Sequence, residues 1–255
     1  MKSRIVILRH VHLLSILAAI RNEIIFAMDR FIQTNELNKI IDGFSVPLKW
    51  EYSNTNSYNH PIIQILMKRI SIASHDPSPK FQQWFPDKVN NKDTVNYILD
   101  NGWNKPRDIV RLLIAAQNDS LHCNDTAFTQ AAFDSLRKEY SKNSLSEIRQ
   151  ELQSLYSSEE IEMVIRLLRG GPRFTTAEGI RKQAAKGSRA RAFWDERQDS
   201  ILEDFYRAGF WGNVNRSSAQ YSWRWNHKGD TGVLTVNGWE LAIHPALCRE
   251  LSILF

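Results

Sequence analysis

The sequence has no glycine that is followed by lysine. A phosphate-binding loop of the G-x-x-x-x-G-K-[ST] type needs this pair, because glycine lets backbone amides face the phosphates and lysine reaches the outer ones. None of the eleven glycines can therefore form such a loop. The sequence therefore predicts that this chain does not hydrolyse ATP by itself through such a loop.

Cysteines and long apolar runs are equally scarce. Cys123 and Cys248 are the only cysteines, which is too few for a disulfide framework and fits a reducing cytosol. A polar segment separates the apolar stretches 11–20 and 24–28, so neither reaches the roughly 18 apolar residues of a membrane span. No small-x-small cleavage site follows them, which argues against a signal peptide. We expect a cytoplasmic protein without a membrane partner.

Catalytic and metal-binding motifs are also missing. The sequence has no G-x-S-x-G, H-E-x-x-H or D-x-D-x-D-G motif. His244 and Cys248 are spaced to share a helix face, but structural zinc needs four ligands and no C-x-x-C pair supplies the others. We therefore expect no cofactor, no metal and no catalytic residues. A self-contained enzyme remains an alternative, and it would need a deep pocket with shifted pKa values.

The composition is that of a globular protein with one large domain or two small ones. The chain has 255 residues, of which 42% are hydrophobic and 24% charged, and its net charge is +5. This mild basic excess permits contact with nucleic acid but does not establish it.

Short-range patterns predict most elements of the N-terminal part. The run 4–8 predicts a strand buried on both faces, as in a parallel sheet. Residues 13–41 show helical spacing of apolar side chains, and Pro47 predicts an extended piece over 46–50. Ser144 and Glu147 have capping-box spacing. Pro61 and Pro106 suit first helical turns, and helices are predicted at 62–72, 94–100, 109–118, 129–139, 145–155 and 158–168.

The pattern changes after a turn at 170–172. Thr175 and Glu178 have capping-box spacing and predict a helix to about residue 186, and a second helix is predicted over 192–208. Asn237-Gly238 is a hairpin signal, and extended segments are predicted at 210–213, 220–226, 233–236 and 239–243. We therefore predict a mainly helical protein with a small antiparallel β-sheet. It comprises a helical lid-like region with one N-terminal strand-like segment over 1–156, then a winged-helix domain over 157–255.

One basic run is a candidate for phosphate contacts. It contains no acidic residue and comprises Arg181, Lys182, Lys186, Arg189 and Arg191. The helix that follows carries more acidic than basic residues, which disfavours its insertion into a DNA groove. The run is therefore expected to touch phosphates without sequence specificity, or to bind an acidic partner. Arg224 and Lys228 extend this hypothetical nucleic-acid-binding set.

Three aromatic residues alternate along one predicted strand. Tyr221, Trp223 and Trp225 would share one face, where they could stack on bases. We favour the other interpretation, in which they pack onto the helices of the same domain. Arg224 would then point outward.

Several short motifs follow one another in a set order along the chain. The run 103–113 has the pattern W-x-R/K-P-R-D-hydrophobic and resembles a helix of a family of bacterial P-loop ATPases of the AAA+/STAND kind. Further similarities are Ile7-Leu8-Arg9 to its strand-then-arginine, then 38–40, 48–50 and 68–70, and a winged-helix tail at 208–213, 221–225 and 243–247. The Walker A and Walker B motifs are absent, and His10 stands where aspartate often follows the arginine, so ATP binding does not carry over.

The resemblance implies a late core strand, a lid and a winged helix that couples nucleotide state to a partner or effector. It implies that Arg9 is a sensor-like arginine and Arg107 a lid arginine that senses nucleotide in trans. Helix capping or surface ion pairs are the alternatives for both. Some relatives act in bacterial antiviral defence.

Together these features favour a truncated, split or standalone relative of the C-terminal half of such an ATPase. It would be a non-catalytic regulatory or interaction protein whose partner is an ATPase subunit or a second copy of itself. The alternative is a winged-helix DNA-binding protein that makes mostly phosphate contacts.

Overall fold

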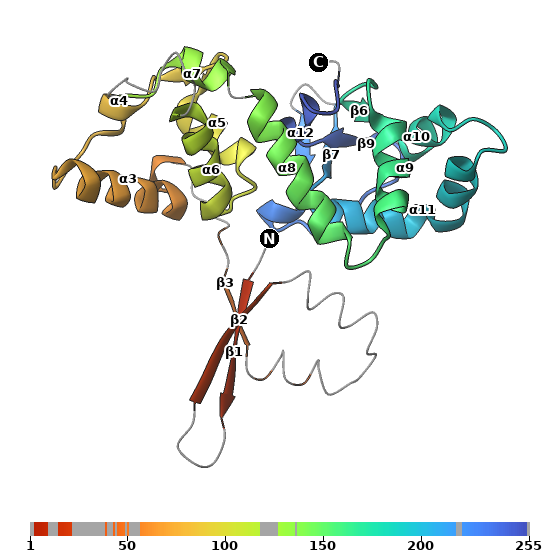
Figure 1. Ribbon diagram of the computed structural model, residues 1–255, viewed down its shortest axis with the longest axis horizontal. Helices are drawn as coiled ribbons and strands as arrows, with labels where there is room; N and C mark the ends of the chain where they lie inside the picture. The colour runs from red at the N-terminus through yellow and green to blue at the C-terminus, as the bar shows by residue number, and fades with distance from the viewer. Residues whose placement is uncertain are drawn as a thin grey trace.

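The computed structural model describes residues 3–9, 15–21, 39, 43, 45–48, 50, 57–117, 127–135, 137–217 and 221–253. Helices dominate these residues, and small antiparallel sheets accompany them. The prediction of a mainly helical protein with a small antiparallel sheet toward the C-terminus is confirmed (Figure 1).

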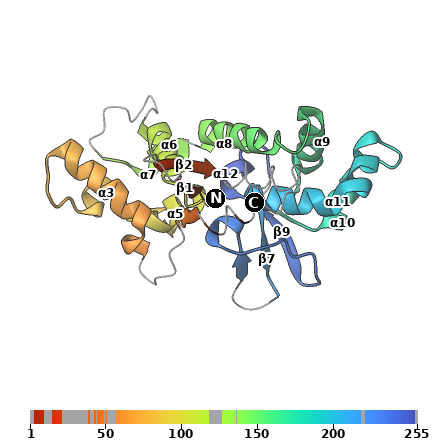
Figure 2. The ribbon, with the colours of Figure 1, turned by 90° about the horizontal axis from the view of Figure 1, so that it is seen from below.

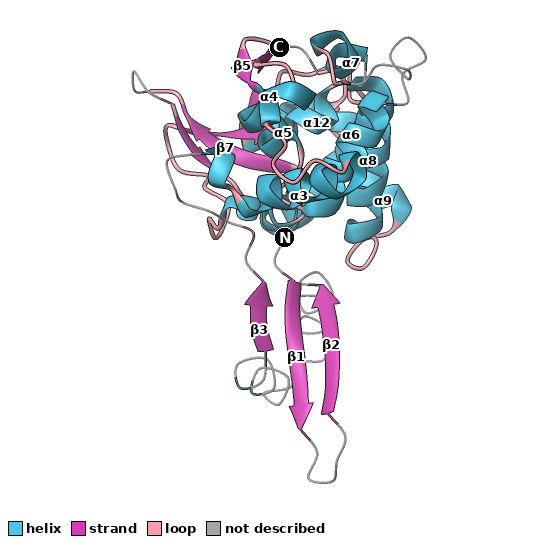
Figure 3. Ribbon diagram, turned by 90° about the vertical axis from the view of Figure 1, so that its left-hand side faces the viewer, coloured by secondary structure: helices cyan, strands magenta, loops and turns pink. Residues whose placement is uncertain are grey.

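The N-terminal strands form a separate antiparallel sheet. β1 (Ser3–Arg9) lies between β2 (Ser15–Arg21) and β3 (Ser45–Leu48), and Figure 3 shows the three strands set apart from the helices. The prediction of a parallel strand at 4–8 is therefore wrong. The helix predicted over 13–41 is wrong at 15–21, because these residues form β2. Each of them pairs with a residue of β1, and this pairing provides hydrogen-bond partners for the backbone groups of both strands. Residues 22–38 of that prediction lie outside the described residues.

The central part of the chain is helical. The predicted starts of α3 and α6 are confirmed, because these helices begin at Pro61 and Pro106 and proline suits a first helical turn. His60 supports the start of α3 by accepting a hydrogen bond at Nδ1 from the Ile62 amide, at 3.3 Å. The elements are η1 (Ser57–Asn59), α3 (Pro61–Ser74), α4 (Phe81–Trp84), β4 (Lys88–Val89), β5 (Lys92–Asp93), α5 (Thr94–Asn101), α6 (Pro106–Gln117), α7 (Gln130–Ser135), α8 (Arg137–Leu152) and α9 (Ser158–Leu168).

Two capping predictions need correction. Ser144 and Glu147 lie inside α8, where Ser144 is buried, so they do not begin a helix. The helix after β6 is capped by Thr176, whose Oγ1 accepts a hydrogen bond from the Gly179 amide at 3.0 Å, rather than by Thr175. A capping pattern specifies spacing, whereas tertiary packing decides which of several candidates ends the helix.

The C-terminal part combines a four-stranded antiparallel sheet with helices. The strand order is β6-β9-β7-β8, and Figure 2 shows β7 and β9 extending away from α8 and α9. Residues 233–236 form no strand, so Asn237-Gly238 makes a turn that leads into β9 rather than a two-stranded hairpin. The elements are β6 (Phe174–Thr175), α10 (Ala177–Gln183), α11 (Arg189–Arg207), β7 (Trp211–Asn215), β8 (Ser222–Arg224), η2 (Asn226–Lys228), β9 (Trp239–Ile243) and α12 (Pro245–Cys248).

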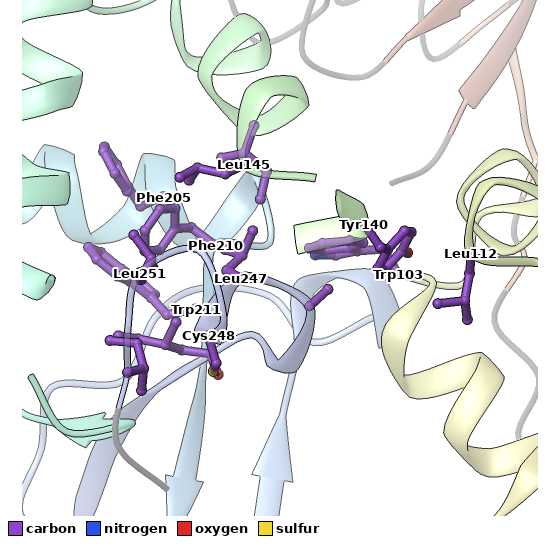
Figure 4. Close-up of a cluster of buried hydrophobic side chains, with 14 of the residues drawn as sticks. Trp103, Leu112, Tyr140, Leu145, Phe205, Phe210, Trp211, Leu247, Cys248 and Leu251 are labelled. Atoms are coloured by element: carbon purple, nitrogen blue, oxygen red, sulfur yellow. The ribbon is translucent and has the colours of Figure 1, made fainter. Parts of the chain in front are cut away.

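One face of this sheet joins the main hydrophobic core. Trp211 stacks on Phe205 of α11 with ring centroids 5.1 Å apart, and both side chains are fully buried (Figure 4). The same buried cluster includes residues from Ile62 to Ile253, so the hydrophobic core is continuous across residue 156. The domain boundary predicted at residue 156 stays a prediction. Within the described part of the chain, no helix is both long and apolar enough to cross a bilayer.

Candidate functional site

An apolar cavity of about 320 Å³ lies between α3 and α6. Ile62, Leu66 and Ile109 are buried in its wall, whereas Ile65 keeps 41% of its surface exposed. Three arginines also line the cavity: Arg69, Arg107 and Arg111. An apolar cavity lined in part by cations is suited to a partner that has both apolar and acidic groups.

Arg107 is an exposed charge at this cavity. Its guanidinium contacts Glu147 Oε1 of α8 at 2.8 Å, yet 64% of its side chain is exposed. Arg111 contacts the other carboxylate oxygen of the same glutamate. Because Arg111 keeps Glu147 paired, Arg107 can turn toward a partner without leaving that carboxylate uncompensated.

A buried carboxyl lies beside this pair. Burial raises the pKa of Asp108 to about 6; Glu147 and Glu151 add to the rise, whereas Lys105 and Arg111 oppose it. The Arg111 guanidinium lies 3.8 Å from Asp108. The cavity therefore has a titratable group close to its arginines.

The other predicted sensor, Arg9, is the last residue of β1 and lies opposite Ser15 of β2. Its position at a strand end agrees with the predicted strand-then-arginine order. Its role stays a prediction.

The basic run meets acidic partners that come from elsewhere in the fold. Asp195 of α11 contacts both Arg181 and Arg191, at 2.7 and 3.0 Å. Arg189 pairs with Glu159 of α9, while Lys182 and Lys186 are exposed. These ion pairs neutralise much of the run, with one acidic partner that precedes it in sequence, Glu159, and one that follows it, Asp195.

The two remaining basic candidates are also paired. Lys228 contacts Asp100 of α5 at 3.0 Å, and Arg224 lies 3.6 Å from Asp230. Arg224 is opposite the buried Asn213 of β7, so it lies on the face that packs against the helices. The prediction that Arg224 points outward is wrong.

The aromatic side chains of this strand therefore lie on the sheet face opposite to the one that packs against the helices. Trp225 is 6% exposed, but Trp223 and Tyr221 keep 39% and 51% of their surfaces exposed. Trp225 packs with Val214 and Ala242 in a small cluster separate from the main core. The prediction that all three aromatics pack onto the helices is wrong, because this face of the sheet is turned away from them.

A second set of contacts joins α5 and α6 to the C-terminal sheet. The Trp103 ring stacks on His244 with centroids 3.8 Å apart, and its Nε1–H donates to the Gly209 carbonyl at 2.8 Å. Asn104 donates to the carbonyl of His227 at 3.4 Å. The sequence analysis did not predict this junction. The sequence feature that marks its position is the Asn101-Gly102 break between α5 and α6.

The junction holds two buried histidines. His244 Nδ1 accepts from the Ala246 amide at 3.3 Å, and burial lowers the pKa of both His227 and His244 well below the ordinary value. The Cys248 thiol donates to the His244 carbonyl, and burial raises its pKa to about 11. A protonated thiol is a poor metal ligand, and the described residues contain no cluster of three or more groups suited to a metal ion.

Comparison with known proteins identifies one part of the chain. Residues 60–149 match the family model of a FunZ-associated C-terminal helical domain. This stretch spans α3 to most of α8 and includes the cavity, Arg107 and Trp103. Neither the comparison with curated proteins nor that with solved structures gave a match. The chain is thus similar, over residues 60–149, to a helical domain found at the C-terminal side of other proteins.

Proposed function

We propose that this chain is a non-catalytic interaction protein that couples the nucleotide state of a P-loop ATPase of the AAA+/STAND kind to an effector. A role in bacterial antiviral defence is part of the same proposal. The observation that carries it is the exposed Arg107 at the α3–α6 cavity, within the stretch similar to a C-terminal helical domain.

The chemistry of Arg107 suits this role. A guanidinium keeps its charge at all physiological pH values and presents forked donors that match a phosphate. Arg107 lies in the first turn of α6 with most of its side chain in solvent. It would leave Glu147 for the partner's nucleotide or an acidic side chain, while Arg111 retains the glutamate.

Site-specific photo-crosslinking tests the proposal. A photoreactive amino acid is placed at Arg107 in the native host, and cross-linked proteins are identified by mass spectrometry. The control places it at Glu178, which is exposed on α10. The proposal expects a P-loop ATPase at position 107 only, with a yield that changes with bound nucleotide. Tight ATP binding with turnover by the isolated chain would contradict it.

Binding of duplex DNA by the basic run is the second candidate. Its support is the exposure of Lys182 and Lys186 and the exposed guanidinium of Arg189. The pairing of Arg181 and Arg191 with Asp195 opposes it, because a phosphate would have to displace that carboxylate. Duplex affinity that falls steeply with salt and drops in the Arg189→Ala, Arg191→Ala variant would favour this candidate.

A further inference from the structure

The outer face of the C-terminal sheet carries exposed aromatic side chains. Residues directly opposite one another in an antiparallel sheet share a face, and so do residues two apart in a strand. The register pairs Phe174 with Ala242, and Val214 with both Glu240 and Trp223. Phe174 and Trp223 therefore lie on the face opposite to the one that Trp211 contributes to the core.

Close packing within the face orients its rings. An added Cβ at Gly212 would lie 2.5 Å from the Trp225 ring, so the ring lies directly on the Gly212 backbone. The Trp223 ring is parallel to Trp225 within 9°, with centroids 6.2 Å apart, and Phe174 lies 6.0 Å from Trp223. The sheet thus presents rings in a fixed orientation rather than a loose apolar patch.

Arginines flank these rings. The guanidinium of Arg173 lies 5.2 Å from the Phe174 centroid and 5.8 Å from that of Trp223. Arg216 lies 4.6 Å from Phe174 and makes two hydrogen bonds to Glu240, at 2.6 and 3.0 Å. Glu240 offsets the charge of Arg216, and Arg173 adds a positive charge beside the rings. A purely apolar partner would have to desolvate these guanidinium groups, which is costly.

We infer that this outer face, defined by Phe174, Tyr221, Trp223, Arg173 and Arg216, binds single-stranded nucleic acid. Exposed Trp223 and Tyr221 stack on bases, Arg173 contacts a phosphate, and Arg216 does so by exchanging Glu240 for a phosphate. Single strands combine flat rings with a polyanionic backbone, which matches a face of aromatic rings and cations. Duplex DNA shields its base faces and cannot use the rings. This site is separate from the α3–α6 cavity, so it stands or falls independently of the proposed ATPase partner.

The test measures fluorescence anisotropy of a labelled oligothymidine or oligouridine of about twelve nucleotides, which exceeds the smallest known site sizes. The full chain is titrated at low and moderate salt, with a duplex of the same length in parallel. We expect single strands to bind more tightly than the duplex, and affinity to fall with salt. Trp223→Leu and Tyr221→Ala are each expected to weaken single-strand binding about fivefold to hundredfold.

Matched variants separate the face from general effects. Tyr58→Ala removes a similarly exposed tyrosine in the helical part and is expected to leave the affinity unchanged. Arg216→Gln keeps the rings and is expected to weaken binding and reduce its salt dependence. Circular dichroism establishes that each variant is folded. Absence of single-strand binding, equal binding of the duplex, or indifference to the Trp223 and Tyr221 substitutions overturns the inference. Self-association that depends on Trp223 without nucleic-acid binding also overturns it, because the occupant is then a second copy.

Discussion

Gly209→Ala is expected to destabilise the protein by disrupting the junction at Trp103. Gly209 has a φ of 76°, a conformation that L-residues adopt at a cost of about 1–2 kcal/mol. An added Cβ would lie 2.7 Å from both Cδ1 and Nε1 of Trp103. The ring would have to move away from His244 and from the Gly209 carbonyl that it now contacts.

Gly187→Ala is the matched control for this change. Gly187 also has a φ of 76°, but an added Cβ would meet no atom within 4 Å. The two substitutions therefore share the backbone cost and differ in the contact with Trp103. Forcing atoms into a packed site costs about 1–3 kcal/mol, and the lost hydrogen bond adds about 1 kcal/mol. We expect Gly209→Ala to cost about 2–4 kcal/mol more than Gly187→Ala.

Urea denaturation followed by circular dichroism measures both unfolding free energies. A double-mutant cycle with Trp103→Phe sharpens the test, because phenylalanine is smaller and has no N–H to donate. The extra cost of Gly209→Ala should shrink in that background. If Gly209→Ala costs no more than Gly187→Ala, the contact between Trp103 and the Gly209 backbone does not stabilise the fold and the reasoning is refuted.

Three further outcomes are expected. The folded-state pKa of Asp108 is raised to about 6, above its unfolded value, so stability is lost as pH rises from about 4 through about 6. Asp108→Asn should remove this loss, measured as the difference in unfolding free energy between about pH 4 and pH 7. Burial lowers the pKa of His227 and His244, so stability should fall as pH drops below about 6.5, and His227→Leu should reduce that fall in acid denaturation. Gly212→Ala should displace Trp225, whose ring lies 2.5 Å from the added Cβ, and change the near-ultraviolet circular dichroism.

Each expectation would be contradicted by one result. If Asp108→Asn leaves the loss of stability with rising pH intact, that loss comes from other groups. Acid stability unaltered by His227→Leu would show that this imidazole takes up no proton on unfolding. An unchanged aromatic spectrum in Gly212→Ala would mean that Trp225 does not rest on the Gly212 backbone.

Local signals along the chain predicted much of the helical structure. Proline in a first turn located α3 and α6, and the helices predicted at 94–100 and 158–168 correspond to α5 and α9 within a few residues. These signals succeed because helix starts and helix faces are properties of neighbouring residues. The same reasoning failed at β2, whose apolar residues also fit a helix, because only pairing with β1 makes a strand.

The candidate sites depended on contacts that no spacing encodes. The sequence alone determined that Arg107 would open a helix and that Trp223 and Trp225 would share a strand face. Only the tertiary structure placed Glu147 beside Arg107, brought Asp195 between Arg181 and Arg191, and turned Trp223 toward solvent. Helix starts and strand alternation arise from backbone geometry over a few residues. Charge partners and exposed faces depend instead on which distant segments the hydrophobic core brings together.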